Sequence, residues 1–142
     1  AISTKKESKE LNPGDEITIY NITFSAIPAY NTHRYRSPGN PFHPKESGHI
    51  GSIIDFEGIK IYHAGDTDKI PEMKTIDVDI ALLPVSGTYV MDVSECTEAA
   101  QEIKAEIIIP MHVGRGIGKL NHREKLKKKL ANKKVVILEM EE

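Results

Sequence analysis

Apolar and polar residues alternate in the first part of the chain as they do in half-buried β-strands. The alternating apolar residues are Ile17, Ile19, Ile22, Phe24 and Ala26. A period of two is typical of a strand with one face turned to the core. The pattern predicts a β-hairpin that turns near Tyr20-Asn21 and ends at Pro28.

A second hairpin is predicted after a long irregular segment. Residues 29–48 contain three prolines and two glycines and show little periodicity, so we expect a long loop. Ile50 to Phe56 and Ile59 to Tyr62 then form two strands around the turn Glu57-Gly58. Long loops inside compact domains usually carry function, so residues 29–48 are expected to be an active-site loop.

The second half of the chain changes to a pattern of strands and helices. Val78 to Val85 is almost wholly apolar, as in a strand buried on both faces, and Ile107 to Met111 is another buried strand. Between them, a helix from about Ser94 to Lys104 is predicted, and Asp92 with Glu95 three residues later suits a capping box at its start.

The chain closes with a second helix and a last strand. A basic helix from about His122 to Ala131 places Leu126 and Leu130 on one face, and Val135 to Leu138 is the expected closing strand. Hairpins followed by a strand–helix–strand unit predict an α/β fold of α+β layered character.

The composition is that of an ordinary folded protein. Hydrophobic residues make up 39% and charged residues 28% of the chain, and the formal net charge of -2 gives no general attraction to nucleic acids or anionic membranes. Cys96 is the only cysteine, which excludes an intrachain disulfide and a cysteine-rich zinc site. No apolar run approaches the ~20 residues of a membrane span, and no signal peptide opens the chain, so we expect a cytoplasmic protein without a membrane partner.

Residues with ligand chemistry follow the predicted strands directly. Asp66 comes soon after Tyr62, and His112 comes directly after the strand that ends at Met111. Binding groups in layered α/β proteins gather in the loops past the strand ends, so this carboxylate and this imidazole are expected at one edge of the sheet. Zinc, manganese and iron accept both kinds of ligand. Alone, each residue could be a turn cap or a surface residue, but their joint placement favours a metal site.

Four segments in fixed order closely resemble one branch of the metallo-β-lactamase fold. They are Tyr62-His63-Ala64-Gly65-Asp66-Thr67-Asp68, Ile70-Pro71-Glu72-Met73, the run from Ala81 to Asp92, and Ile109-Pro110-Met111-His112. This branch holds uncharacterised metal-dependent hydrolases and is similar to L-ascorbate-6-phosphate lactonase and, more distantly, to N-acyl-phosphatidylethanolamine phospholipase D. The resemblance implies the C-terminal half of a metallo-β-lactamase αββα sandwich. It does not identify the substrate, because this fold serves lactones, thioesters, phosphodiesters and β-lactams.

The resemblance also implies metal ligands. Asp66 would bridge two divalent ions, zinc above all with manganese or iron as alternatives, and His112 would bind one of them. Related sequences often supply a further ligand from an Ala-Tyr-His segment, where this chain has Ala29-Tyr30-Asn31. His43 is the expected replacement, either as a metal ligand or as an acid at the substrate. Its competitors are His33 and His49.

Residues around Asp66 are expected to complete the site. His63 would orient Asp66, and Thr67 would hydrogen-bond the Asp66 carboxylate or cap the next turn. The loop Gly87-Thr88-Tyr89 would offer backbone N–H groups or the Tyr89 hydroxyl to the substrate. We expect the basic cluster from Lys125 to Lys134 to be a solvated helix face rather than a nucleic-acid site.

The early His-x-His-x-Asp-His signature of the fold is absent from this sequence. We therefore expect residues 1–142 to be a single partial domain, opened by a polar segment at residues 1–11, that needs a missing N-terminal half or a second chain. Half of this fold leaves one sheet face uncovered, so the chain is expected to form a homo-oligomer or to be accompanied.

Two functions follow from these patterns. The first is a metal-dependent hydrolase whose metal-activated water attacks an ester, lactone or phosphodiester bond, with this chain alone inactive. The alternative is a non-catalytic half-fold that acts as a protein or RNA interaction module.

Overall fold

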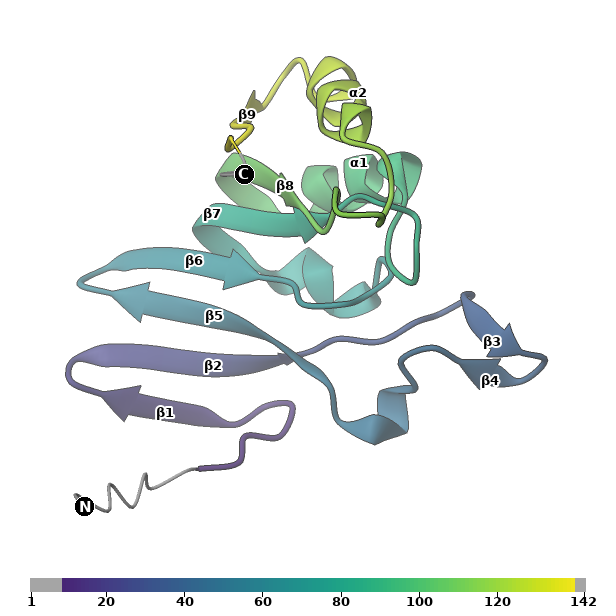
Figure 1. Cartoon of the computed structure of the whole chain (residues 1–142). Helices are drawn as coiled ribbons and strands as arrows, with labels where there is room; N and C mark the ends of the chain where they lie inside the picture. Colours follow the sequence, from purple (N-terminus) through teal and green to yellow (C-terminus); the bar gives the residue numbers. More distant parts are fainter. Residues whose placement is uncertain (1–8, 140–142) are drawn as a thin grey trace, which may run out of the picture.

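The computed structural model describes residues 9–139 and builds them around one seven-stranded sheet of order β1-β2-β5-β6-β7-β8-β9 (Figure 1). Most of the polar segment expected at residues 1–11 lies outside the described residues. The strands of this sheet are β1 (Glu16–Ile19), β2 (Ile22–Pro28), β5 (Ile50–Phe56), β6 (Ile59–His63), β7 (Asp77–Pro84), β8 (Lys104–Met111) and β9 (Lys134–Val135). Both helices and most strands lie within a few residues of the bounds that the sequence predicts.

The two predicted hairpins are confirmed together with their turns. β1 pairs with β2, and β5 pairs with β6, each antiparallel and each through a two-residue connection. Tyr20 and Asn21 have φ of 48° and 65°, and Glu57 and Gly58 have φ of 51° and 86°. Positive φ at both central residues defines the type I′ turn, whose twist matches that of the flanking strands.

The second half of the sheet is parallel. β6, β7, β8 and β9 run in one direction, so their carboxyl ends lie at the same edge. Helix α1 (Val93–Glu102) connects β7 to β8, and the 3-10 helix η2 (Pro71–Thr75) connects β6 to β7. The predicted capping box is present, because Asp92 accepts from the backbone at Ser94 and Glu95 while the Glu95 side chain returns to the Asp92 N–H. The parallel order explains why polar residues that follow different strands can meet.

The last strand is shorter than the sequence predicts. Helix α2 (Asn121–Lys129) is followed by β9, which covers only Lys134–Val135 instead of extending to Leu138. The carbonyl of Leu138 accepts a hydrogen bond from the Arg123 side chain of α2 at 3.0 Å. The backbone there is satisfied by a helix side chain, so it does not need to continue the pairing with β8.

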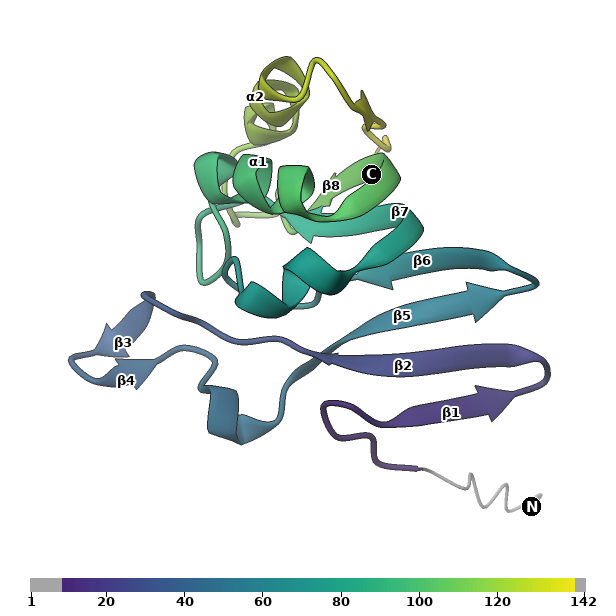
Figure 2. The ribbon, with the colours of Figure 1, turned by 180° about the vertical axis from the view of Figure 1, so that it is seen from behind.

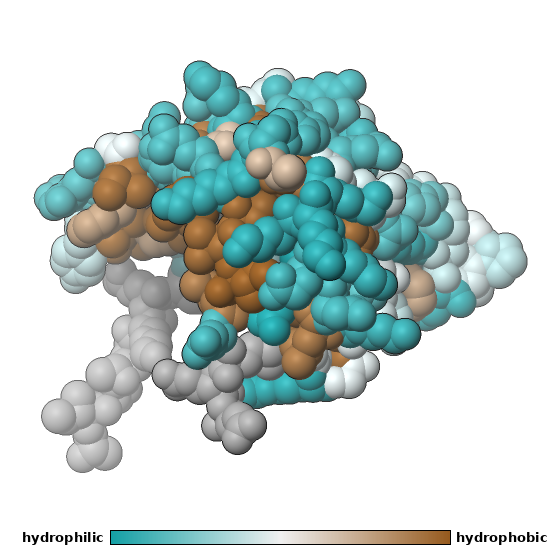
Figure 3. All heavy atoms as spheres, turned by 90° about the horizontal axis from the view of Figure 1, so that it is seen from above, coloured by the Kyte–Doolittle hydropathy of each residue, from teal (hydrophilic) through white to brown (hydrophobic). Residues whose placement is uncertain are grey.

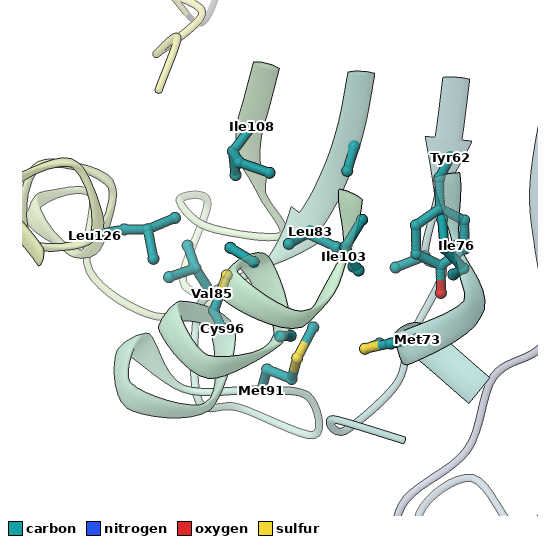
Figure 4. Packing of buried hydrophobic residues seen from close by; sticks show 14 of the residues in the cluster. Tyr62, Met73, Ile76, Leu83, Val85, Met91, Cys96, Ile103, Ile108 and Leu126 are labelled. Atoms are coloured by element: carbon teal, nitrogen blue, oxygen red, sulfur yellow. The ribbon is translucent and has the colours of Figure 1, made fainter. Parts of the chain in front are cut away.

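The core lies on one face of the sheet only. Tyr62, Leu83 and Ile108 point from the sheet toward Met73 of η2 and Cys96 of α1, and all five are fully buried (Figure 4). Burial of each such side chain contributes roughly 1.5–3 kcal/mol. Leu126 and Leu130 of the α2 segment complete this layer. Burial also raises the pKa of the Cys96 thiol, which marks it as an inert core residue.

The described helices leave the opposite face of the sheet uncovered (Figures 1 and 2). This face carries a row of apolar side chains. In the strand register this row consists of Ile17, Phe24, Ile54, Ile61, Ile80 and Ile107. Each of these residues is only partly buried. The prediction that Val78 to Val85 is buried on both faces is therefore wrong for the described residues, since Ile80 and Leu82 lie on this open face. We call it the open face below.

The segment 29–48 is more ordered than the expected loop. It contains β3 (Tyr35–Ser37) and β4 (Asn40–Pro41), which form a small separate hairpin, and the 3-10 helix η1 (Lys45–Ser47). The hairpin projects from the end of the main sheet (Figure 1). Its base is anchored by backbone hydrogen bonds from Ala29 to His49 and from Asn31 to His43. None of the helices in residues 9–139 combines the length and apolar character required to span a membrane.

Candidate functional site

Three residues singled out by the sequence converge at the carboxyl edge of the parallel strands. Nε2 of His112 lies 3.5 Å from Oδ1 of Asp66, and Nε2 of His43 lies 3.6 Å from Oδ2 of the same carboxylate. Asp66 is half exposed, whereas the two histidines are largely buried. Among the described residues, only these histidines bring a titratable nitrogen within salt-bridge distance of Asp66. One carboxylate therefore faces a different imidazole through each of its oxygens.

His112 is held in place by the loop that follows β7. Its Nδ1 lies 3.0 Å from the hydroxyl of Ser86, which in turn donates to the carbonyl of Thr88. A hydroxyl that donates to a carbonyl accepts from Nδ1–H, and this arrangement leaves Nε2 of His112 free to face Asp66. His112 has a φ of 60°, a backbone conformation that a bulky residue adopts only when its surroundings enforce it.

The loop 114–118 presses against this Ser86–His112 pair. Gly118 has a φ of 60°, and a Cβ at this position would lie 2.6 Å from the Cβ of Ser86. Only glycine allows the backbone to come this close to Ser86. The glycine-rich stretch after His112 therefore packs the residue that orients it.

His43 is held by the segment before the small hairpin. Its Nδ1 lies 3.0 Å from Oδ1 of Asn31, and its backbone N–H donates to the same oxygen at 2.8 Å. Of the three candidate histidines, His43 is the one that the fold brings to Asp66. The ring of His49 stacks edge-on against His43 with centroids 5.5 Å apart, while His33 lies against Glu95 instead.

Asp66 follows a tight connection after β6. Gly65 has a φ of 70°, and a Cβ there would lie 3.0 Å from the carbonyl oxygen of Ile50. The small residue at this position is needed for contact between two backbone segments.

Thr67 and His63, which we expect from the sequence to contact the Asp66 side chain, make hydrogen bonds elsewhere. The Thr67 hydroxyl is fully buried and bonds to the backbone of Tyr30 and Asp68, not to the Asp66 carboxylate, so that expectation is wrong. It docks the segment around Tyr30 onto the β6–η2 connection. Nδ1 of His63 accepts from the N–H of Gly65 at 3.2 Å. His63 therefore holds the loop that carries Asp66 and makes no hydrogen bond to its side chain.

A second cluster of ligand-type side chains is already occupied by an arginine. His33, Asp68 and Glu95 offer ligand atoms within 4.8 Å of one another. The Arg34 guanidinium donates to Asp68 at 2.6 Å and also to Glu95. Because this cation already neutralises the buried carboxylate, the cluster is a structural ion-pair network that fastens the hairpin segment to α1.

The charge state of Asp68 follows from the same contacts. Burial alone would raise its pKa, but hydrogen bonds from the backbone N–H groups of Thr32 and His33 and from Arg34 lower the pKa below its ordinary value. Asp68 is thus an ionised carboxylate that only accepts hydrogen bonds at neutral pH.

A pocket adjoins the candidate site on the side of the small hairpin. It has a volume of about 260 Å³ and is lined by Arg36, Phe42, His43 and Tyr89. The rings of Phe42 and Tyr89 meet edge to face with centroids 4.6 Å apart. Tyr89, with a φ of 64°, reaches the pocket from the loop after β7. His43 belongs to both the pocket wall and the Asp66 cluster.

The sequence did not single out Asn31 and Ser86, which fix the orientation of the two histidines. Asn31 is 6% exposed and Ser86 is 4% exposed. Polar residues are rarely so buried unless their hydrogen bonds are satisfied. The only signal in the sequence was the position of Asn31, where related sequences often carry a histidine.

The similarity of the chain to known proteins agrees with this geometry. The family described as beta-lactamase superfamily domain matches residues 3–112. The chain belongs to this superfamily. A UPF0173 metal-dependent hydrolase of Thermoplasma acidophilum is 42% identical over 112 residues, which cover 75% of the chain and 46% of that protein. The α+β layered fold and the relation to metal-dependent hydrolases are thus confirmed.

Solved structures support the same assignment. A candidate metal-dependent hydrolase from Parabacteroides distasonis is 37% identical with a TM-score of 0.78, covering 95% of this chain and 59% of that one. The metallo-β-lactamase fold protein YhfI from Bacillus subtilis is 13% identical with a TM-score of 0.68, covering 94% of this chain and 53% of that one, and shows the fold alone. The beta-lactamase superfamily chain described here spans less than half the length of its Thermoplasma relative.

The donor set at Asp66 fits a divalent metal ion. Metal bonds to nitrogen and carboxylate oxygen of about 2.0–2.2 Å in tetrahedral geometry place neighbouring ligand atoms about 3.3–3.6 Å apart. The observed separations between Asp66 and the two histidines are 3.5 and 3.6 Å. Two imidazoles that face one carboxylate at these distances are a suitable ligand group for zinc, manganese or iron.

Proposed function

We propose that this chain contributes Asp66, His43 and His112 to the metal centre of a hydrolase that acts on an ester, lactone or phosphodiester bond. The observation that supports it best is that both oxygens of Asp66 face an imidazole Nε2 at 3.5–3.6 Å. This carboxylate and the two imidazoles would hold a divalent metal ion, and zinc accepts this mixture of nitrogen and oxygen ligands.

Each residue has a distinct part in this proposal. When bound, divalent metal supplies an activated water at neutral pH and stabilises negative charge on the substrate oxygen. His112 and His43 would hold the metal through Nε2, the ring nitrogen that faces the Asp66 carboxylate in each case. Ser86 orients His112 through the 3.0 Å contact with Nδ1. Such orienting contacts raise the basicity of a ligand and fix its geometry.

The segment 29–48 would form one wall of the substrate site. Phe42 and Tyr89 supply apolar area, and Arg36 places a guanidinium 5.8 Å from the Phe42 ring at the edge of the pocket. In the described residues Arg36 has no carboxylate partner, so its charge is available to an anionic group of a substrate. The Tyr89 hydroxyl, with no hydrogen-bond partner in the described residues, is available in the same way.

The open face would bind the remainder of the hydrolase. It carries partly exposed apolar residues on six adjacent strands, and Ile19, Phe56 and Ile59 at its margin are 46%, 48% and 52% exposed. Figure 3, which looks down on the molecule from above the view of Figure 1, shows hydrophobic residues at the surface between hydrophilic ones on that side. A second sheet that packs here would bury this area, and the longer relatives have enough additional chain to supply it, together with further metal ligands.

Zinc binding by the purified chain tests the proposal. We expect at least one zinc per chain by elemental analysis, and we expect Asp66→Asn to remove it while the circular dichroism spectrum stays unchanged. Esterase and phosphodiesterase activity are then measured after the chain is mixed with the N-terminal half of a relative. Less than one equivalent of zinc in the wild-type chain, with no effect of Asp66→Asn, would end the proposal.

The open face by itself also supports the second candidate, a non-catalytic interaction module. Its apolar row would serve a protein partner as well as a second sheet, and the lysines of α2 are exposed while Leu126 is buried. This candidate leaves the convergence of Asp66, His43 and His112 unexplained. Salt-sensitive retention of RNA by a zinc-free, folded chain would favour it.

A further inference from the structure

Asn31 is a buried polar side chain whose every hydrogen-bonding position is used. Its Nδ2 donates to Oδ1 of Asp68 at 3.0 Å and to the carbonyl of Tyr89 at 2.9 Å. Its Oδ1 lies 2.8 Å from the backbone nitrogen and 3.0 Å from Nδ1 of His43. Its own backbone N–H donates to the carbonyl of His43 at 2.9 Å. Asn31 thus connects the ion-pair network around Asp68 with both His43 and Tyr89.

The chemistry of these partners fixes which way the Asn31 amide points. The Tyr89 carbonyl has no proton, and the Asp68 carboxylate already accepts from Arg34 and from the backbone N–H groups of Thr32 and His33, so both groups act as acceptors. The amide end that faces them must therefore be the NH₂ group. The carbonyl oxygen must then be the end that faces His43, in agreement with the backbone N–H of His43, which can only donate.

The same reasoning fixes the proton on the His43 ring. The Asn31 Oδ1 has no proton to give, so the 3.0 Å contact is a hydrogen bond only when Nδ1 of His43 carries the hydrogen. In the neutral ring, Nε2 then presents its lone pair. That lone pair lies 3.6 Å from Oδ2 of Asp66, so two acceptors face each other and a cation between them would be favoured.

We propose that Asn31 is the positioning residue of this site, which holds His43 as the Nδ1–H tautomer and turns its Nε2 lone pair toward Asp66. This inference rests on the proposed function, because it assigns His43 to a divalent metal ion. The imidazole follows strand β4 of the small hairpin, and the amide at position 31 orients it. Asn31 also donates to the Tyr89 carbonyl in the loop after β7. It therefore fixes the position of His43 relative to Tyr89, which lines the pocket.

Nitrogen-15 NMR of the metal-free chain at pH 8 tests the tautomer directly. The two ring nitrogens of His43 have different shifts when one is protonated, and His43→Ala identifies its signals. We expect Nδ1–H for His43. His49, which is exposed and makes no hydrogen bond through its ring in the described residues, serves as the internal comparison. A His43 ring protonated at Nε2 would overturn the inference.

Two substitutions separate the orienting role from a merely structural one. Asn31→Asp keeps an acceptor for Nδ1 but loses both donors, whereas Asn31→Leu keeps the branched shape and loses the acceptor as well. We expect Asn31→Leu to lower zinc affinity about 10- to 100-fold and to lose the Nδ1–H preference. Asn31→Asp is expected to keep that preference and to lose less zinc affinity than Asn31→Leu, although its second oxygen would face the Asp68 carboxylate and the Tyr89 carbonyl and lower the stability of the fold. Asn40→Asp, on the exposed β4 strand, controls for added charge.

The outcomes distinguish this inference from the proposed function. If the wild-type chain binds no zinc but His43 is protonated at Nδ1, the proposed function fails while the orienting contact stands. The second case is that the wild-type chain binds zinc at Asp66, but both Asn31→Asp and Asn31→Leu lower the zinc affinity and the Nδ1–H preference to the same extent. The Oδ1 contact then has no orienting role, and this inference fails while the proposed function stands. If either variant does not fold, the tautomer of the wild-type ring decides.

Discussion

Nε2 of His112 lies 3.5 Å from Oδ1 of Asp66, although the two residues follow different strands, β8 and β6. The parallel direction of β6, β7 and β8 brings their carboxyl ends to one edge, and Ser86 after β7 orients the imidazole. Because each residue of the site follows a different strand, single substitutions can test the contribution of each residue to metal binding.

His43 and His33 distinguish the two clusters of ligand-type side chains. Loss of a residue that only orients a ligand lowers metal affinity by up to about 100-fold. His43→Ala removes a ligand itself, so it should lower zinc affinity by more than this. His33→Ala should leave zinc affinity within about twofold, because Arg34 already occupies the cluster to which His33 belongs. Isothermal titration calorimetry with zinc measures both variants. The reverse order of effects would move the metal site to Asp68 and Glu95.

Ser86 should act on zinc only through His112. Ser86→Ala removes the acceptor at 3.0 Å from Nδ1, and we expect about a tenfold loss of zinc affinity with little loss of stability. Ser94→Ala, at an exposed position of α1, is the control. An unchanged zinc affinity in Ser86→Ala, measured by the same titration, would mean that the loop backbone alone fixes His112.

Asp68 should make the chain sensitive to acid. Its pKa is lowered in the folded state, so the folded chain binds fewer protons than the unfolded one. The stability from this group is fully present above its ordinary pKa of 3.8 and is lost as the pH falls from there toward the folded value. Urea unfolding between pH 3 and 7 should show this loss in the wild-type chain and a flatter profile in Asp68→Asn.

The Asp68→Asn variant should also be less stable at pH 7, by about 1–3 kcal/mol, because Arg34 keeps Glu95 but loses the buried carboxylate, and the backbone N–H groups of Thr32 and His33 lose a charged acceptor. Asp77→Asn provides the comparison, since Asp77 pairs with Lys104 at the surface and an exposed pair contributes only about 0–1 kcal/mol. Equal destabilisation by both substitutions would show that the buried network has no special weight.

The open face should drive association of the isolated chain. Phe24→Glu places a charge within the apolar row and should shift the chain toward the monomer in sedimentation velocity experiments. Thr23→Glu is the matched control, because its side chain lies on the opposite face of the same strand. A monomeric wild-type chain at all concentrations would show that the open face is not an association surface.

The sequence by itself determined the elements and the ligand types of this protein. The alternation of apolar and polar residues predicted the two hairpins, and the Asp92–Glu95 pair predicted the start of α1. The positions of Asp66 and His112 after apolar strands predicted that they meet at one edge of the sheet. These features are local, because each depends on residues a few positions apart.

Only the tertiary structure decided which histidine meets Asp66 and what orients it. His33, His43 and His49 lie in one irregular segment, and periodicity cannot rank them. The fold places His43 at Asp66 because Asn31 is buried between it, Asp68 and Tyr89. Contacts between such distant positions depend on chain packing, so local patterns do not encode them. For the same reason the one-sided cover of the sheet, which leaves Ile80 and Leu82 partly exposed, could not be read from an apolar run alone.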